Sequence, residues 1–180
     1  FAGPTIVAFG TDGQKERFLR PILTGDELWC QLFSEPDSGS DLASLRTAAT
    51  RADGGWRITG QKIWTSRAQL AANAILLART GGADIPRHRG ITYFLLPLAS
   101  PGVTVRPLRH MGGDVEFNEV WLDGALVPDA YRVGDEGAGW KVANATLAGE
   151  RQMVSGSGSG GVDRIGGRGI DHAIGLAHKR

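Results

Sequence analysis

An apolar strand that ends in hydroxyls, a proline and a glycine turn stands at residues 29–41, which read WCQLFSEPDSGSD. Pro36 favours an extended conformation at the residue before it. The serines and glycine that follow predict a turn with exposed backbone N–H groups. Residues 40–43 can begin a helical turn, whose N–H groups and dipole bind anions such as a pyrophosphate. Taken alone, the stretch is also compatible with a surface turn between two strands.

A second stretch, GQKIWTS at residues 60–66, carries an aromatic ring followed at once by two hydroxyls. Trp64 could be a core residue, but its polar neighbours place it badly for full burial, so its ring can form a flat wall. Together the two stretches offer an apolar surface, hydrogen-bond donors and a small-residue loop. These are the parts needed to hold a planar heterocycle and its phosphate tail, so a flavin site is the leading hypothesis.

The composition is that of an ordinary globular protein. The 180 residues are 41% hydrophobic and 22% charged, and 20 Lys and Arg against 19 Asp and Glu leave a net charge of +1. This balance gives no reason to expect nucleic acid or an anionic membrane as partner. No apolar run approaches a membrane span, and no signal peptide is visible. The single cysteine, Cys30, excludes an internal disulfide, favours a cytoplasmic location and is expected to serve packing.

The order of local signals predicts three parts: 1–27 as the end of an N-terminal helical domain, 28–133 as a β-domain, and 134–180 as the start of a C-terminal helical domain. Gly10 is expected to close a first helix in the left-handed conformation, and Thr11 with Gln14 forms a capping-box pattern that opens a second. Seven short strands without intervening helices predict an antiparallel barrel or sandwich. The expected strands are 29–34, 46–51, 56–66, 74–80, 90–96, 103–108 and 117–122.

The two ends of the chain suggest a piece of a longer protein. The chain begins at Phe1, and residues 174–180 run in helical style with no stop signal. Residues 155–169 contain seven glycines, which predicts a flexible break, with a helix whose glycines permit close packing as the alternative. This stretch also satisfies G-x-G-x-x-G, but no strand precedes it, so a dinucleotide-binding function is disfavoured. The four histidines lack metal-ligand spacing, so no zinc is expected.

The chain resembles the acyl-CoA dehydrogenase family in segments that occur in the same order: residues 29–41, 60–66, FNEVWLD at 117–123, Val127-Pro128 and GAGW at 137–140. The resemblance implies an α+β fold in which a central antiparallel β-barrel or sandwich is flanked by truncated helical segments. It implies FAD as cofactor, an acyl-CoA as substrate and electron-transfer flavoprotein as electron acceptor. It also implies assembly with like subunits as a homo- or hetero-oligomer.

The resemblance further implies which residues form the site. The expected flavin-binding residues are Gln31, Leu32, Phe33, Ser34, Gly39, Ser40, Trp64, Thr65 and Ser66. Ser40 is also expected to touch the acyl-CoA, and the hydroxyl of Ser66 to face flavin N5. Serine stands at positions 34 and 66 where threonine is common, which keeps the hydroxyl but loses the methyl that restricts the rotamer. Asp37 replaces a usual glycine and Arg67 a common asparagine.

The reaction that the resemblance implies removes two hydrogens across the α and β carbons of an acyl-CoA thioester. A carboxylate takes the α proton while flavin N5 accepts the hydride. A desolvated carboxylate near an apolar chain has a raised pKa, which suits a base. The family places this glutamate either late in its last domain, beyond Arg180, or directly before an arginine in that domain's first helix. Glu150-Arg151 occupies the second position, so Glu150 is a candidate base, or else a surface charge, and Arg151 a candidate substrate contact.

Other functions stay open at this level. An acyl-CoA oxidase or flavin monooxygenase of the same fold would use dioxygen as electron acceptor. A non-catalytic acyl-CoA-binding subunit would keep the barrel without the chemistry. The isolated chain is expected to be inactive and to bind FAD weakly, because a neighbouring subunit usually completes the flavin site in the family.

Overall fold

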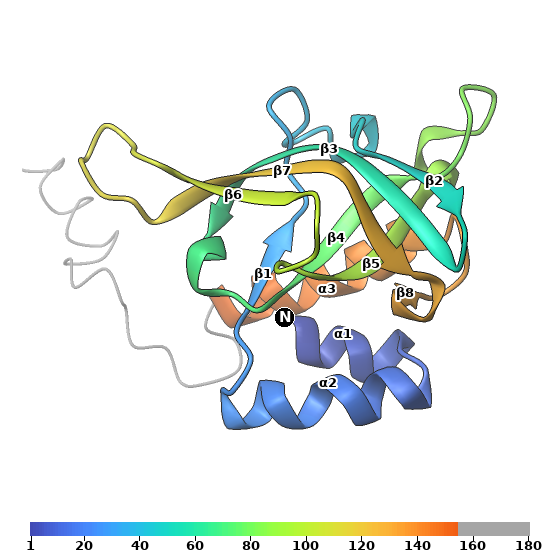
Figure 1. Cartoon of the computed structure of the whole chain (residues 1–180), viewed down its shortest axis with the longest axis horizontal. Helices are drawn as coiled ribbons and strands as arrows, with labels where there is room; N and C mark the ends of the chain where they lie inside the picture. The colour runs from blue at the N-terminus through green and yellow to red at the C-terminus, as the bar shows by residue number, and fades with distance from the viewer. Residues whose placement is uncertain (155–180) are drawn as a thin grey trace, which may run out of the picture.

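The computed structural model describes residues 1–154 and has an α+β fold (Figure 1). The predicted break at 155–169 and its glycine motif lie outside the described residues. In chain order the helices and strands are α1 (Ala2–Phe9), α2 (Asp12–Thr24), β1 (Trp29–Leu32), β2 (Ala48–Ala52), β3 (Gly55–Ser66), β4 (Asn73–Arg79), β5 (Ile91–Pro97), β6 (Val103–Leu108), β7 (Phe117–Pro128), β8 (Arg132–Val133) and α3 (Gly139–Val154).

The first two helices form as predicted, with one correction. The Thr11 hydroxyl accepts a hydrogen bond from Gln14 N at 3.2 Å, and Gln14 Oε1 accepts one from Thr11 N at 3.1 Å, which confirms the capping box. Gly10, however, is extended with φ −76°, so the left-handed prediction is wrong. Glycine is required there because a Cβ would lie 2.5 Å from the carbonyl oxygen of Ile6. The left-handed terminus belongs instead to Gly25, after α2.

The eight strands form one open sheet in the order β6-β7-β3-β2-β4-β5-β8, with β1 paired to β4 beside this path. Because β6 and β8 end the path within the described residues, the sheet does not close, and the fold is a sandwich rather than a barrel. Most pairs are antiparallel as predicted, but β1 and β2 each pair with β4 in parallel. The excursion of the chain between β1 and β4 permits this pairing, since parallel strands need a long crossover. β8 was not predicted, because two residues show no alternation.

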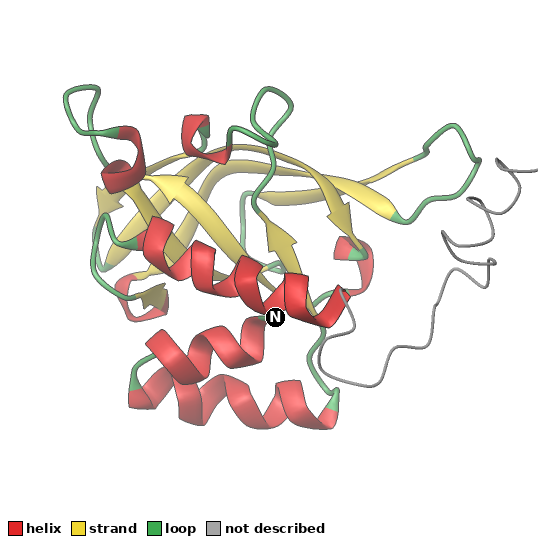
Figure 2. Ribbon diagram, turned by 180° about the vertical axis from the view of Figure 1, so that it is seen from behind, coloured by secondary structure: helices red, strands yellow, loops and turns green. Residues whose placement is uncertain are grey.

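The sandwich and its helices enclose two apolar cores on opposite faces of β4 and β5. Leu76 and Phe94 pack against Trp56 in the core between the two halves of the sheet. Ile75 and Tyr93, their neighbours in the strands, point to the other face, where α1 and α3 cover the sheet (Figure 2). β4 is buried at six successive positions, as is typical of a strand covered on both sides. Each strand of this layer therefore has a sandwich side and a helix side.

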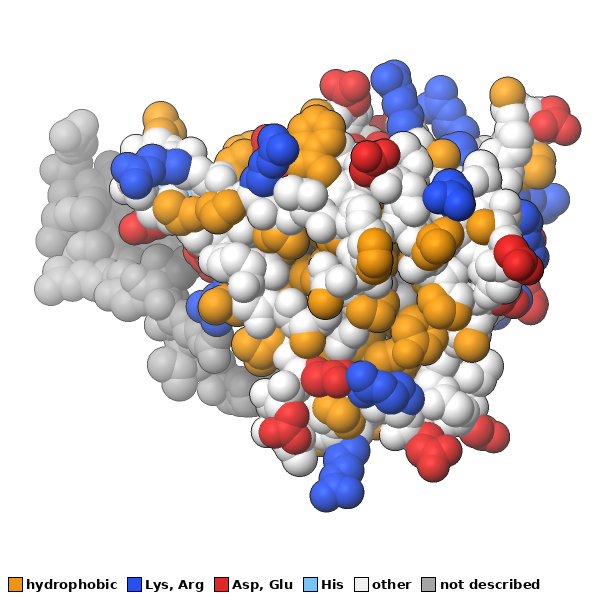
Figure 3. Space-filling model, viewed as in Figure 1, with side chains coloured by type: hydrophobic (Ala, Val, Ile, Leu, Met, Phe, Trp, Pro, Cys, Tyr) orange, Lys and Arg blue, Asp and Glu red, His pale blue; other side chains and the backbone are white. Residues whose placement is uncertain are grey.

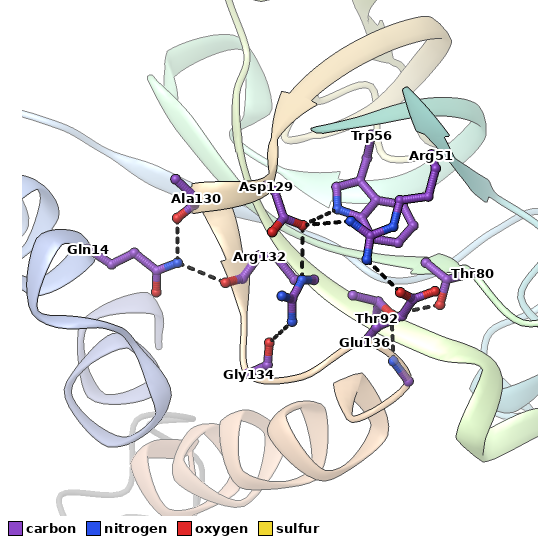
Figure 4. A network of polar contacts seen from close by, with 11 residues as sticks. Gln14, Arg51, Trp56, Thr80, Thr92, Asp129, Ala130, Arg132, Gly134 and Glu136 are labelled. Atoms are coloured by element: carbon purple, nitrogen blue, oxygen red, sulfur yellow. Dashed lines mark hydrogen bonds and ion pairs between the residues drawn. The ribbon is translucent and has the colours of Figure 1, made fainter. Parts of the chain in front are cut away.

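A polar network around Asp129 ties α2 and the ends of three strands together (Figure 4). Asp129 Oδ1 accepts hydrogen bonds from Trp56 Nε1 at 2.8 Å and Arg132 Nε at 3.2 Å, and Arg51 Nη1 lies 3.3 Å away. Gln14 Nε2 donates to the carbonyl of Ala130, before β8, at 2.7 Å and to that of Arg132, in β8, at 2.8 Å. These bonds hold the N-terminal end of α2 against the sheet.

On the face seen in Figure 3, hydrophobic side chains are mixed with charged side chains of both signs, and neither the positive nor the negative side chains form a large patch. This distribution agrees with the balanced net charge of the sequence. None of the helices in the described part of the chain is long and apolar enough to cross a membrane.

Candidate functional site

A cavity of about 280 Å³ brings together the two sequence stretches and α3. The residues that line it come from β1 and the loop after it, from β3 and its end, from α3, and from the first residue of the chain. They are Phe1, Trp29, Gln31, Phe33, Ser34, Ile63, Trp64, Ser66, Arg67 and Glu150. Six of the residues that the sequence predicted for one site therefore meet at one cavity: Gln31, Phe33, Ser34, Trp64, Ser66 and Glu150.

Strand alternation decides which residues of β1 reach the cavity. Gln31 and Phe33 lie on the helix side of the layer and line the cavity, and Trp29 precedes them on the same side. Leu32 points into the sandwich core and is fully buried, so its side chain forms no part of the cavity wall. Cys30 is also in that core, where burial raises the pKa of its thiol to about 12 and makes it a packing residue rather than a nucleophile.

The second wall is formed by a distortion in β3. The pairing register of β3 with β7 shifts between Lys62 and Thr65, and at this bulge Trp64 has φ +59°. Trp64 is 54% exposed, and its ring packs edge-on against Phe117 at 5.9 Å between centroids. Arg67, with φ +55°, is the only other non-glycine residue with positive φ among the described residues. Such strained positions are held by their surroundings and gather at functional sites.

The two residues after Trp64 face opposite ways. Ser66 lines the cavity. Thr65 is buried, its carbonyl accepts a hydrogen bond from Asn118 Nδ2 at 3.0 Å, and its hydroxyl has no partner among the described residues. The structure thus brings one of the two predicted hydroxyls to the cavity and leaves the other behind the wall.

The turn after Pro36 lies apart from this cavity. Gly39 and Ser40 are exposed and do not line it. The helical turn predicted from Ser40 is a three-residue 3₁₀ turn, Leu42–Ser44. Before it, the Asp41 carboxylate accepts a hydrogen bond from the Ser44 hydroxyl and makes no capping bond to the backbone N–H groups of the turn.

Two hydrogen bonds to backbone carbonyls join the loop after β1 to β3, and the one from Lys62 is buried. Ile63 N donates to Ser34 O at 3.0 Å, and Lys62 Nζ donates to Phe33 O at 3.0 Å. Lys62 Nζ also lies 2.8 Å from Glu35 Oε1. Burial lowers the pKa of Lys62 to about 8, although the charge of Glu35 offsets part of that effect. Burial opposes ionisation of Glu35 too, but the Lys62 charge and the donors around the carboxylate outweigh it, and the Glu35 pKa is lowered.

α3 brings Glu150 to the cavity and leaves Arg151 outside. Glu150 is half-buried, lines the cavity, and its Oε2 is buried without a hydrogen-bond partner among the described residues. Thr146, one turn earlier, is buried and fixes the rotation of the helix through its contact with Tyr93. Arg151 is exposed and does not line the cavity. The interpretation of Glu150 as a plain surface charge therefore fits the geometry less well.

The cavity also contains residues that sequence reasoning missed. Trp29 could have been found from its two-residue spacing to Gln31 and Phe33 along the strand. Ile63 could have been found from its place beside Trp64, whereas no local signal marks Phe1. Trp29 Nε1 and Gln31 Oε1 are, like Glu150 Oε2, buried polar atoms without a hydrogen-bond partner in the described part of the chain. Because unpaired buried polar atoms are costly, three of them around one cavity indicate a polar ligand.

Comparisons with known proteins agree with this picture. Residues 30–124 match the family model described as acyl-CoA dehydrogenase, middle domain. The chain is 55% identical to the acyl-CoA dehydrogenase FadE34 of Mycobacterium tuberculosis, over 86% of this chain and 22% of that protein. It therefore spans well under half the length of this relative.

Two solved structures extend the likeness to the fold. A structure described as "Tcur3481-Tcur3483 steroid ACAD G363A variant" superposes with a TM-score of 0.79 at 37% identity, over 83% of this chain and 39% of that one. A structure described as "FAD complex of PigA" does so with a TM-score of 0.73 at 25% identity, over 80% and 38%. The match of the family model over more than half of the chain places the chain in the acyl-CoA dehydrogenase family.

Proposed function

We propose that this chain supplies the flavin site and the catalytic base of an FAD-dependent acyl-CoA dehydrogenase, which oxidises the α–β bond of an acyl-CoA thioester. The observation that carries the proposal is the cavity in which Phe33, Ser34, Trp64 and Ser66 meet Glu150. We also propose the division into 1–27, 28–133 and 134–180, in which the middle part contributes both walls and the last part contributes the base.

The residues around the cavity suit FAD. The Phe33 and Trp64 rings offer flat apolar surfaces, and the unpaired Gln31 Oε1 and the Ser66 hydroxyl offer hydrogen bonds to a heterocycle. Ser34 and Thr65 complete the proposed contacts, Leu32 supports them from the core, and Gly39 with Ser40 serves the parts of the ligand outside the cavity. When bound, FAD supplies the hydride acceptor for the dehydrogenation.

Glu150 is the proposed base. Its unpaired, buried Oε2 can take the α proton of the acyl-CoA, whose C–H bond is acidified by the thioester carbonyl. An apolar acyl chain beside Phe1 and Phe33 would exclude water from the carboxylate. Arg151, exposed beside Glu150, is a proposed contact for the polar CoA portion. Electron-transfer flavoprotein as electron acceptor and assembly with like subunits also belong to the proposal, and both rest on the family membership.

Anaerobic titration of the intact, FAD-loaded protein with acyl-CoAs tests this function. The panel should include straight, branched and steroid-bearing CoA esters, since one similar structure is described as a steroid enzyme. Wild type should show a flavin spectrum that bleaches with at least one ester. Glu150→Gln should keep the flavin spectrum and lose bleaching. Glu16→Gln, an exposed carboxylate on α2, is the matched control and should bleach as wild type does.

The possible outcomes separate the parts of the proposal. Absence of bound flavin in wild type would overturn the flavin site. Near-normal bleaching of Glu150→Gln would place the base elsewhere in the protein. Fast reoxidation of the reduced protein by air, followed by stopped flow, would favour an oxidase over a dehydrogenase.

A further inference from the structure

The cavity has one wall formed by Phe33 and Ser34 and a second wall formed by Trp64 and Ser66. Pairing between strands does not fix the position of one wall relative to the other. β1 pairs with β4, whereas β3 pairs with β2 and β7, so no ladder of backbone hydrogen bonds connects the end of β1 with β3. In the described residues the connection between them is made by the two bonds to Phe33 O and Ser34 O. One of these bonds comes from a backbone amide and the other from the ammonium group of Lys62.

Lys62 has an unusual environment for a lysine. Its side chain is 0% exposed, and Nζ makes both of its contacts, with Phe33 O at 3.0 Å and Glu35 Oε1 at 2.8 Å, inside the protein. Lysine is almost never fully buried unless it is paired. A buried ion pair is weak evidence of a stabilising role, because apolar residues of similar volume are often as stable or more so. Its position between the two walls points to a different role.

Glu35 extends the connection to a third segment. Its carboxylate accepts hydrogen bonds from Arg46 N at 2.6 Å and Thr47 N at 2.9 Å, just before β2. Its backbone pairs with Ser38 in both directions, at 2.8 and 3.1 Å, which closes the turn after Pro36. The carboxylate thus anchors the ammonium to the sheet while the ammonium holds the carbonyl of Phe33.

We propose that Lys62 is a positioning residue for the flavin site: its ammonium, anchored by Glu35, sets the distance between the Phe33–Ser34 wall and the Trp64–Ser66 wall. This inference rests on the proposed function. Lys62 touches no ligand itself and acts through the backbone at position 33. Loss of the ammonium leaves the Ile63 N bond to Ser34 O as the single hydrogen bond between the walls among the described residues, so the flavin ring meets a wall of variable position.

Charge-neutral double substitutions in the intact protein separate positioning from stability. Glu35→Gln with Lys62→Met removes both charges at once, which avoids the penalty of leaving one of them unpaired. Its FAD affinity, measured by flavin fluorescence, should fall at least about tenfold, a loss of about 1.4 kcal/mol in binding free energy, because the ring then meets a wall of variable position. The absorption maxima of any bound flavin should also shift relative to wild type.

Two further variants keep the test decisive. Glu35→Gln with Lys62→Gln retains a polar pair and should fold even if the methionine variant does not. The glutamine at position 62 is one bond shorter than lysine and does not reach Phe33 O, so FAD affinity should fall in this variant too. Arg51→Ala, which breaks contacts with Asp129 and Glu136 away from the cavity, controls for lost stability and should bind FAD within about twofold of wild type.

Wild-type affinity and an unshifted spectrum in either folded double variant would overturn the positioning role. An equal loss in Arg51→Ala would overturn it as well, since instability alone would then explain the effect. Failure of the wild-type protein to bind FAD would instead contradict the proposed function, so the two failures are distinguishable.

Discussion

Thr5 and Thr146, 141 residues apart in the chain, place their hydroxyl oxygens 2.8 Å from each other in the buried layer between α1 and α3. Thr146 also lies 3.2 Å from the Tyr93 hydroxyl and donates to Val142 O at 3.0 Å. This cluster joins α1, α3 and β5 at a single point. Glu150 follows Thr146 by one helical turn, so the cluster also sets the direction of Glu150 toward the cavity.

Replacing Thr146 by valine should lower the free energy of unfolding by about 1–3 kcal/mol, because the Thr5 and Tyr93 hydroxyls each lose one hydrogen-bond partner inside the protein. Burial raises the pKa of Tyr93, so its hydroxyl stays protonated and cannot compensate by ionising. Urea denaturation followed by circular dichroism measures the change. Thr104→Val on exposed β6 is the control and should shift stability by less than about 0.5 kcal/mol. Equal effects of the two substitutions would mean that the buried cluster contributes nothing.

Gly60→Ala should destabilise the protein by about 1–3 kcal/mol, the usual effect of overpacking a tight site. A Cβ at position 60 would lie 2.5 Å from Thr47 Oγ1 and 2.7 Å from Thr47 Cα, and the backbone atom cannot move away without displacing β2. Gly13→Ala in α2, with no atom within 4 Å of the added Cβ, should instead stabilise by up to about 1 kcal/mol. Thermal unfolding of both variants checks the prediction, which fails if the two shifts have the same sign.

Arg67→Gly should raise the free energy of unfolding by about 1 kcal/mol, because it relieves a left-handed conformation that costs a non-glycine residue roughly 1–2 kcal/mol. Trp64→Gly relieves the same kind of strain but loses the packing against Phe117. The free energy of unfolding of this variant should therefore differ less from wild type than that of Arg67→Gly. If the proposed function holds, Trp64→Gly should also weaken FAD binding, because one flat wall is gone. Chemical denaturation and FAD titration of both variants give the comparison. Destabilisation by Arg67→Gly would show that position 67 is not strained.

The free energy of unfolding should rise between pH 8 and 9, by up to about 1 kcal/mol. Burial lowers the Lys62 pKa from 10.5 to about 8, so above pH 8 the unfolded state binds more protons than the folded state. Cys30 opposes part of this effect from about pH 8 upward, because burial raises its pKa from 9.0 to about 12 and only the unfolded thiol ionises there. Urea titrations at pH 8.0, 8.5 and 9.0 measure the rise. It should disappear in Lys62→Met, and its persistence there would assign it to another group.

Much of the local architecture could be predicted because it depends on neighbours in the sequence. The capping box of Thr11 and Gln14 involves only adjacent residues, and the structure contains it. Strand positions were predicted from alternation and turn signals to within a few residues, except that β7 continues to Pro128 and β8 was missed. Gly10 was mispredicted because its requirement is a close contact with Ile6 rather than a backbone angle.

The sequence by itself determined most of the segments that become helix or strand, the family, and the two stretches that form the cavity walls. Only the tertiary structure decided that Gln31 faces the cavity while Leu32 faces the core, because that choice depends on which side of β1 the helices cover. The partnership of Lys62 with Glu35, 27 residues apart, was equally invisible. Local conformation follows from neighbouring residues. The two cavity walls instead meet through the register shift between β3 and β7, the buried Lys62–Glu35 pair and packing between distant segments. These contacts exist only once the chain has folded.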